Sequence, residues 1–398
     1  MLVRFAATIP LRHVRAGEVR WEKFLYELKA GPAGGRLRRP SSAGNPTATG
    51  AGRLNASALR RSARRATEIS GRQRCRVADG VGNVTDPLHE DEFLIDLRLV
   101  RALVGRALPE CVSLPLSPLR ASGSSNALFR LGDELLIRLP RQPGGSATIE
   151  KEAHWLPQIG PLLPVSVPEV VAVGEPDLGY PERWSVVRWL EGDVPTVVDP
   201  ASRAASTRPA LARDLAAVVT ALHDIQVPDS ALADPQLRWY RGAPLGSMDD
   251  TTRHNVAACR DISGLDLDLD AALRIWEEAM ALPETGPGST PRWYHGDLLA
   301  ENLLVRNGRL AAVLDFGALA VGDPTVDLIV AWEVLDPASR EVFRRAVGVD
   351  ETSWLRGRAW ALSLALITFP YYWSTMPDRC ASRLAVTRSV LADAASTQ

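Results

Sequence analysis

The sequence predicts an α+β fold with two lobes, a strand-rich N-terminal lobe and a helix-rich C-terminal lobe. Between residues 116 and 190 many apolar residues occur in short runs separated by turn residues, a pattern typical of an antiparallel sheet. The run Glu-Gly-Asp-Val-Pro at 191–195 breaks this pattern and indicates a hinge. Beyond the hinge, most apolar residues recur at helical spacing. We therefore expect an N-terminal lobe over 84–190 and a C-terminal lobe over 196–398.

Residues 1–83 differ in composition from the rest of the chain. They hold 17 Arg and Lys against 5 Asp and Glu, a net charge of +12, whereas the remainder holds 29 against 42, a net charge of −13. With few periodic apolar residues, this segment cannot bury enough surface to offset its ordering entropy, so we expect a disordered basic extension. Three interpretations remain open: an arm for nucleic acid or membrane, a transit peptide, or translation from a start codon upstream of the native one. We favour the last, and exclude the segment from the fold.

The remaining composition indicates a cytoplasmic protein that binds neither membrane nor nucleic acid. Cys75, Cys111, Cys259 and Cys380 are far apart and lack metal-ligand spacing, which favours a reducing compartment without disulfides. The apolar stretch 359–373 is shorter than the roughly 18–20 residues of a membrane span, so it predicts a core helix. The acidic body favours cationic small molecules over nucleic acid. No motif indicates an oligomeric state.

The N-terminal lobe is predicted to contain two helices and a meander of strands. Apolar spacing predicts an amphipathic helix over 91–108, and strands with turns follow over 116–140. The expected tip of this meander, Ser-Gly-Ser-Ser-Asn at 122–126, has backbone N–H groups that can face a phosphate, although such a tip is more often only a turn. A helix over 147–163 and strands at 169–174 and 184–190 complete the lobe.

The C-terminal lobe is predicted to be mainly helical, with a few strands around a central loop at residues 296–302. Asp323 and Pro324 begin a helix that extends to about 335, since Asp caps helices and Pro suits the first turn. Most of 227–268 is irregular and polar. The other expected helices are 209–225, 251–261, 269–281, 337–347, 353–373 and 378–395, and the expected strands are 292–295, 303–305 and 310–315.

Three polar residues in a fixed order indicate the chemistry. Asp297 is followed by Asn302 and, after another strand, by Asp315 in an Asp-Phe-Gly run, the parts that a kinase-like phosphotransferase uses. Asp297 can accept a hydrogen bond from a substrate hydroxyl, and the Asn302 amide oxygen suits a hard cation. Asp315 follows an apolar strand, where a cation such as magnesium would compensate its charge. Taken singly, each residue can also be a turn or cap residue.

Nearby polar residues are predicted to be structural. We expect His295 to be a hydrogen-bonding residue rather than a base. Asp327 can bond His295 or the backbone of its loop, while both Asp323 and Asp327 also suit a helix N-terminus.

The combined pattern resembles the aminoglycoside phosphotransferase family, which has a protein-kinase-like fold. The pattern consists of His-Gly-Asp-x4-Asn, then Leu-Asp-Phe-Gly, then Gly-Asp-Pro-x2-Asp-Leu, and the resemblance extends over about 90–395. It implies a small-molecule O-phosphotransferase that uses ATP or GTP, with Asp297 as catalytic base. It also implies that Asn302 and Asp315 bind Mg²⁺.

The resemblance also implies a nucleotide site in the N-terminal lobe. Ser124, Ser125 and Asn126 match the nucleotide loop, and Val187 and Trp189 match the adenine-binding linker. Where the family usually has a Lys that holds phosphates, this sequence has Arg138, which keeps the charge but is bulkier. The helix carboxylate that orients this cation would be Glu152, with Glu150 as the alternative.

The acceptor is less defined by the sequence. Resemblance suggests a hydroxyl of an aminoglycoside or other antibiotic, whereas similar members act on macrolides, choline, homoserine or sugar amines. The stretches 224–270 and 354–373 are expected to line the acceptor pocket, although most aromatic residues of the second stretch are expected in the core. Glu301 receives no role. A hypothesis of another class, a non-catalytic nucleotide-binding module, has only Arg138 in its favour.

Overall fold

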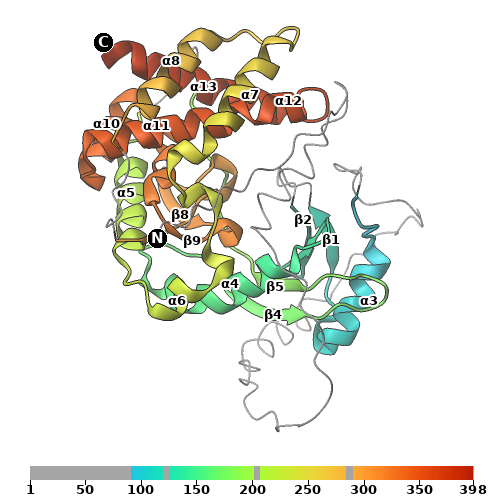
Figure 1. Cartoon of the computed structure of the whole chain (residues 1–398). Helices are drawn as coiled ribbons and strands as arrows, with labels where there is room; N and C mark the ends of the chain where they lie inside the picture. Colours follow the sequence, from blue (N-terminus) through green and yellow to red (C-terminus); the bar gives the residue numbers. More distant parts are fainter. Residues whose placement is uncertain (1–90, 120–124, 201–206, 284–289, 398) are drawn as a thin grey trace, which may run out of the picture. The chain divides into compact units, whose positions relative to one another are not determined.

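The two-lobed, kinase-like α+β fold is confirmed by a computed structural model of the chain (Figure 1). The structure describes residues 91–119, 125–200, 207–283 and 290–397. The predictions for 1–83 and for Ser124 lie outside these residues. An antiparallel sheet forms the N-terminal part, and mostly helices follow it.

Five antiparallel strands in the order β1-β2-β3-β5-β4 form the N-terminal sheet. The alternation along the strands separates its two faces. Ile137 and Leu139 lie in a buried cluster with Phe129, whereas Arg138 points to the opposite face. The strands are β1 (Leu116–Leu119), β2 (Asn126–Leu131), β3 (Leu135–Pro140), β4 (Val170–Gly174) and β5 (Trp184–Arg188).

One helix lies against each face of the sheet. On the first face, α3 (Leu97–Ala107) buries Val100 and Val104 in the cluster of Phe129. This helix begins six residues later than predicted, because the Asp96 side chain accepts a hydrogen bond from the backbone N–H of Leu99 and caps it. On the other face, α4 (Ser146–Ile159) carries the carboxylate that pairs with Arg138.

Short strands frame the central loop of the C-terminal region. The strand β6 (Arg292–Tyr294) pairs with β9 (Ala320–Gly322), and β7 (Leu303–Arg306) pairs with β8 (Arg309–Val313). The β7–β8 turn is Asn307-Gly308, and both residues have positive φ, as a tight hairpin turn requires. Asp193 of the predicted hinge forms a two-way backbone bridge with Val305 of β7. The hinge segment is therefore hydrogen-bonded to the C-terminal region.

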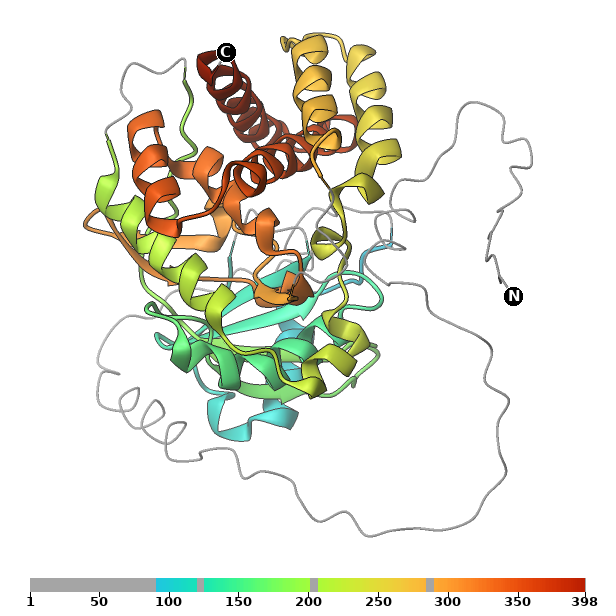
Figure 2. The same cartoon turned by 60° about the vertical axis from the view of Figure 1, so that its left-hand side comes forward.

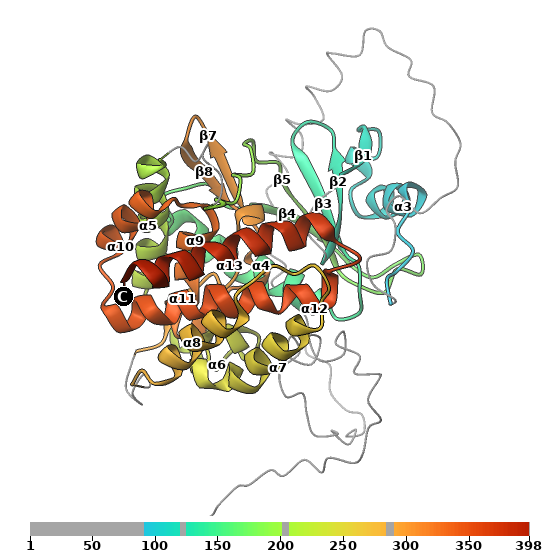
Figure 3. The same ribbon diagram turned by 90° about the horizontal axis from the view of Figure 1, so that it is seen from above.

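The helices of the C-terminal region pack around these strands. In Figure 2, α7 (Asp249–Arg260) and α8 (Leu269–Met280) run side by side. In Figure 3, α11 (Glu351–Leu366) and α13 (Pro377–Thr397) do so. The predicted helix over 353–373 is wrong in one respect: it divides near Ile367 into α11 and α12. The helices are α5 (Pro209–Asp224), α6 (Asp229–Ala233), α7 (Asp249–Arg260), α8 (Leu269–Met280), α9 (Val330–Val334), α10 (Pro337–Val347), α11 (Glu351–Leu366), α12 (Thr368–Tyr372) and α13 (Pro377–Thr397).

Short 3-10 turns occur in two places that border the central loop. Asp323 caps a helical segment as predicted, but its first part is the 3-10 turn η8 (Pro324–Ile329) rather than α-helix. The polar stretch before α7 contains three turns, η3 (Pro235–Leu237), η4 (Tyr240–Gly242) and η5 (Leu245–Met248). Among the described helices, none is both long and apolar enough to cross a lipid bilayer.

Candidate active site

The loop after β6 is fixed by a buried carboxylate. Asp327 of η8 accepts hydrogen bonds from the backbone N–H groups of His295 (2.8 Å) and Gly296 (2.7 Å). It also lies 3.1 Å from Nε2 of His223 and is fully buried. Gly296 has φ of +80°, a conformation that favours glycine. The predicted bond from Asp327 to this loop is confirmed, and it sets the direction in which Asp297 leaves the backbone.

His295 has the structural role that the sequence predicted. Its Nδ1 accepts from the Asp297 N–H (3.2 Å), so its Nε2 is left to donate to the Leu314 carbonyl (3.0 Å). The ring also packs edge-on against Phe316. Both ring nitrogens are occupied, and His295 therefore links the loop of Asp297 to the segment that carries Asp315.

Two residues bind the carboxylate of Asp297, one on each oxygen. Arg241 Nη1 donates to Oδ1 (2.5 Å), and Asn302 Nδ2 donates to Oδ2 (3.0 Å). A quarter of the Asp297 side chain remains exposed. Burial raises the pKa of Asp297, but Arg241, with smaller contributions from His295 and Arg379, outweighs this effect, and the pKa lies below its usual value. The carboxylate is therefore ionised at neutral pH, oriented and within reach of solvent.

Asn302 and Asp315 have the donor atoms that a magnesium ion prefers. Asn302 uses its amide nitrogen on Asp297, for both the side chain and the carbonyl (2.8 Å), and its amide oxygen makes no protein hydrogen bond within the described residues. Asp315 accepts from the Gly317 N–H (3.2 Å), and its side chain is 40% exposed. In the described part of the chain, no cluster of three or more His, Cys, Asp and Glu residues could hold a metal by itself. The pair suits Mg²⁺, which usually takes one or two protein ligands together with phosphates and water.

The cation of β3 is paired as predicted. Arg138 Nη1 lies 2.7 Å from Glu152 Oε2, and its Nη2 lies 3.4 Å from Asp315. The alternative partner, Glu150, instead binds the partly exposed Arg183. Burial raises the pKa of Glu152, although the charge of Arg138 opposes this effect. The pair therefore connects α4, the sheet and the Asp-Phe-Gly segment.

The remaining predicted nucleotide residues lie in or beside the sheet. Asn126 begins β2 opposite Pro140, and the Ser125 carbonyl accepts from the Arg141 N–H. Val187 is buried in β5. The Trp189 ring lies 3.6 Å from the guanidinium of Arg130, so one face of this predicted adenine-linker residue is covered.

Charged residues to which the sequence analysis gave no role lie in or beside the stretches expected to line the acceptor pocket. Arg241 comes from η4, in the irregular polar stretch. Glu301 pairs with Arg379 of α13 (3.1 Å), whose guanidinium lies 5.6 Å from the Tyr372 ring centroid. Burial raises the pKa of Glu301, and Arg379 opposes this effect.

The predicted core position of most late aromatic residues holds only in part. Trp360 and Phe369 are buried, whereas Tyr371, Tyr372 and Trp373 are half-buried. Only the last three therefore have ring surface left for a ligand.

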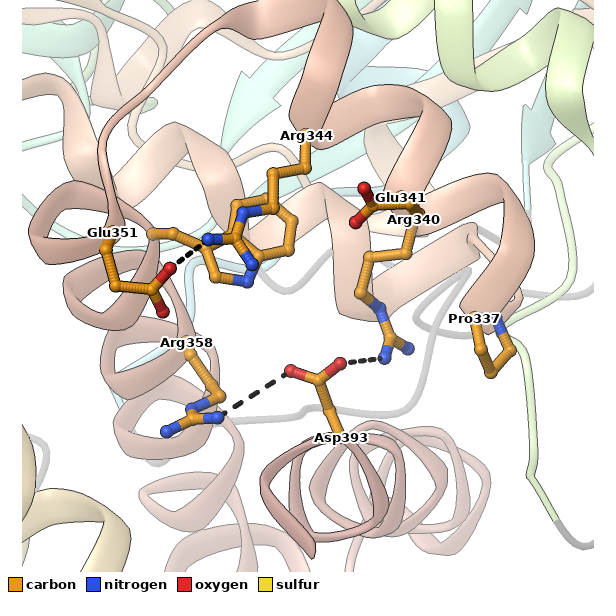
Figure 4. Close-up of a pocket in the computed structure, with 8 residues that line it drawn as sticks. Pro337, Arg340, Glu341, Arg344, Glu351, Arg358 and Asp393 are labelled. Atoms are coloured by element: carbon orange, nitrogen blue, oxygen red, sulfur yellow. Dashed lines mark hydrogen bonds and ion pairs between the residues drawn. The ribbon is translucent and has the colours of Figure 1, made fainter. Parts of the chain in front are cut away.

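A small charged cavity of about 60 Å³ lies apart from these residues, between α10, α11 and α13 (Figure 4). Arg340 and Arg358 point toward Asp393 in its centre, and Arg344 pairs with Glu351. Together with Glu341, three arginines and three carboxylates line the cavity, so their charges cancel. We interpret it as a structural ion-pair network that joins three helices.

Comparison with known proteins gives a family match and a fold match. The model described as "Phosphotransferase enzyme family" matches residues 117–360, more than half of the chain. The structure is similar to the GDP and kanamycin complex of an aminoglycoside 2″-phosphotransferase, with 20% identity, TM-score 0.56, and coverage of 75% of this chain and 99% of the other. It is also similar to the GDP complex of aminoglycoside 2′-phosphotransferase-IIIa, with 19% identity, TM-score 0.56, and coverage of 75% and 100%.

A macrolide 2′-phosphotransferase type I also matches, with 20% identity, TM-score 0.51, and coverage of 73% and 96%. At these low identities, the structural similarity shows a shared fold. No curated protein sequence gives a significant match.

Proposed function

Because this chain belongs to the phosphotransferase enzyme family, we propose that it transfers the terminal phosphoryl group of ATP or GTP to a small-molecule hydroxyl, with Asp297 as the base. It is a kinase-type enzyme, and the acceptor is an alcohol group. In the proposed reaction the hydroxyl oxygen bonds to the terminal phosphorus, and the bond from that phosphorus to its bridging oxygen breaks. The nucleoside diphosphate leaves, and the hydroxyl proton passes to Asp297.

The observation that carries this proposal is the position of Asn302, which bonds Asp297 through its side chain and accepts from the N–H of Leu314, the residue before Asp315, through its carbonyl. Its amide nitrogen binds the Asp297 carboxylate, while its amide oxygen has no protein partner within the described residues. One residue can therefore fix the base and contribute an oxygen to a cation. Mg²⁺ held by Asn302 and Asp315 would neutralise phosphate charge. Arg138, paired with Glu152 and close to Asp315, supports an intact nucleotide site rather than a non-catalytic module.

Positioning is the main task of these residues, because phosphoryl transfer needs little covalent chemistry from the protein. Asp297 is ionised and held at both oxygens, so it can orient an acceptor hydroxyl without first losing a proton. Its low pKa makes it a weak base. This suits a loose transition state, in which the hydroxyl loses its proton late.

The acceptor class that we favour is a cationic antibiotic, in particular an aminoglycoside, with antibiotic resistance as the consequence. The net charge of −13 over residues 84–398 supports a cation. Macrolides, choline, homoserine and sugar amines remain alternatives. We place the reaction in the cytoplasm, where ATP and GTP are made, and the unpaired Cys111, Cys259 and Cys380 agree with this compartment.

A coupled assay for nucleoside diphosphate release tests the proposal. Purified protein is supplied with Mg²⁺, with ATP or GTP, and with aminoglycosides, macrolides or amino alcohols in turn. We expect acceptor-dependent release with at least one combination, and none after Mg²⁺ is chelated. Asp297→Asn should lower kcat by about 10²–10⁴-fold, the usual contribution of a general base. The control is Glu110→Gln, which changes an exposed carboxylate shortly after α3 and should leave kcat unchanged.

Two results would contradict the proposed function. Turnover that survives in Asp297→Asn would remove this residue as the base. Nucleotide binding without transfer to any acceptor would favour the non-catalytic module.

A further inference from the structure

The segment around η4 is attached directly to the strands that carry the central loop. The Gly242 carbonyl accepts from the Asp323 N–H (3.0 Å), and the Tyr294 hydroxyl donates to the Trp239 carbonyl (3.1 Å). A Cβ atom on Gly242 would lie 2.3 Å from the Tyr294 ring, so only glycine allows this approach. The backbone on both sides of Arg241 is therefore fixed to β6 and to the residue that caps η8.

Arg241 uses this fixed position to bind the loop of Asp297. Its Nη1 donates to the Gly296 carbonyl (2.6 Å) and to Asp297 Oδ1 (2.5 Å), while its Nε donates to the Tyr240 hydroxyl (2.9 Å). Nη2 makes no hydrogen bond within the described residues. The guanidinium is thus held by three contacts and keeps one edge free.

The location of this charge matters for the proposed reaction. An ionised Asp297 and the transferred phosphoryl group are both negative, so bringing them together costs electrostatic energy. A fixed cation at Asp297 Oδ1 offsets this repulsion and costs no reorganisation when the reaction occurs. Each carboxylate oxygen keeps a second lone pair, so Asp297 can accept the acceptor hydroxyl while Arg241 and Asn302 remain bound.

We propose that Arg241 is a positioning residue for phosphoryl transfer: it fixes the Asp297 carboxylate and places a permanent positive charge beside the reacting oxygens. The inference rests on the proposed function. Under this proposal, the irregular stretch before α7 contributes to catalysis as well as to the acceptor pocket. A purely structural ion pair is the alternative, and it predicts loss of stability rather than loss of turnover.

The test compares Arg241→Ala and Arg241→Lys with the wild type, on an acceptor that the wild type phosphorylates. We expect Arg241→Ala to lower kcat by about 100-fold, a typical loss for a misplaced catalytic group, with the KM for ATP and the Tm unchanged. Added guanidinium should restore part of this kcat. Arg241→Lys should stay well below wild type, because an ammonium cannot make the guanidinium's forked contacts.

The matched control is Arg98→Ala, which removes an exposed arginine of α3, a helix outside the stretches expected to line the acceptor pocket. It should leave kcat unchanged and show no response to guanidinium. Wild-type kcat in Arg241→Ala would overturn the proposal, and so would a kcat loss that accompanies a lower Tm and resists guanidinium. If Arg241→Ala does not fold, the test relies on Arg241→Lys. Wild-type kcat in Arg241→Lys would overturn the proposal.

These outcomes are separate from those of the proposed function. Turnover that is lost in Asp297→Asn but kept in both Arg241 variants would reject the role of Arg241 alone. Absence of acceptor phosphorylation in the wild type would reject the proposed function and this inference together.

Discussion

Lys151 is a charged residue in a place that is unfavourable for charge. It lies on the inner side of α4, is only 5% exposed, and makes no hydrogen bond or ion pair within the described residues. Its ammonium lies 5.8 Å from the Trp239 ring centroid. Burial lowers its pKa from 10.5 to about 8, although the charges of Glu152, Asp234 and Asp315 oppose the shift.

We predict that Lys151→Met stabilises the protein near pH 7. Below pH 8 the lysine is charged in both states, so the folded state bears the full cost of burying the charge. Between pH 8 and 10.5 only the unfolded state binds the proton, and the stability of the wild type therefore rises with pH. The shift from 10.5 to about 8 corresponds to about 3 kcal/mol, which is the upper limit for the gain.

Urea unfolding of wild type and Lys151→Met at pH 7 and pH 10 measures this effect. The difference in unfolding free energy between the two proteins should be large at pH 7 and mostly lost at pH 10. Comparing the two proteins at each pH cancels the other titrating groups. An equal difference at both pH values would show that packing, and not the buried charge, separates them.

At the scale of elements, η4 and the loop of Asp297 behave as one unit. Gly242 packs on Tyr294 of β6, and a Cβ atom at Gly242 would also approach the Tyr294 hydroxyl to 2.5 Å. We predict that Gly242→Ala moves η4 away from β6 and loosens the contact between Arg241 and Asp297. Overpacking at such a contact costs about 1–3 kcal/mol, and misplacement of a positioning residue lowers kcat by up to about 100-fold.

Thermal unfolding and steady-state kinetics measure both effects of Gly242→Ala. The control is Gly246→Ala in η5, where an added Cβ meets no atom within 4 Å. This variant should keep the wild-type Tm and kcat. If Gly242→Ala kept them as well, η4 would not need its close contact with β6.

Elements could be predicted from the sequence where the signal is local. The β7–β8 hairpin has an Asn-Gly turn between apolar runs, and α5 has a regular apolar face, so both follow from short-range patterns. The division between α11 and α12 and the 3-10 start after Asp323 depend on packing in the folded chain. In both places the sequence pattern predicts that a helix is present, but not where it divides or whether it begins as a 3-10 turn.

At the scale of the whole molecule, local sequence signals predict one part of the candidate site but not the other. Asp297, Asn302 and Asp315 lie within one short stretch, so a motif brings them together before any folding is considered. Arg241 reaches Asp297 from 56 residues earlier, in a stretch without apolar periodicity. Only the folded chain places that charge at the loop, which is why sequence analysis gave this stretch to the acceptor pocket alone.

The last prediction concerns residues 1–83, whose net charge of +12 opposes the −13 of the remainder. Within the described residues, the two buried clusters contain residues from Ile95 to Ala394, and partly buried apolar residues from Phe93 to Leu391 pack against them. We therefore predict that a protein comprising residues 84–398 has the same Tm and the same acceptor-dependent kcat as the full chain. Thermal unfolding and the diphosphate-release assay on both proteins measure this.

Binding to duplex DNA at low and high salt separates the interpretations of this segment. Phosphate contacts by a basic arm weaken steeply as salt rises. We expect neither protein to show such salt-sensitive binding, because the acidic body repels DNA and the proposed reaction needs no nucleic acid. Salt-sensitive binding by the full chain alone would identify residues 1–83 as a nucleic-acid tether, and a lower Tm in the shortened protein would make them part of the fold.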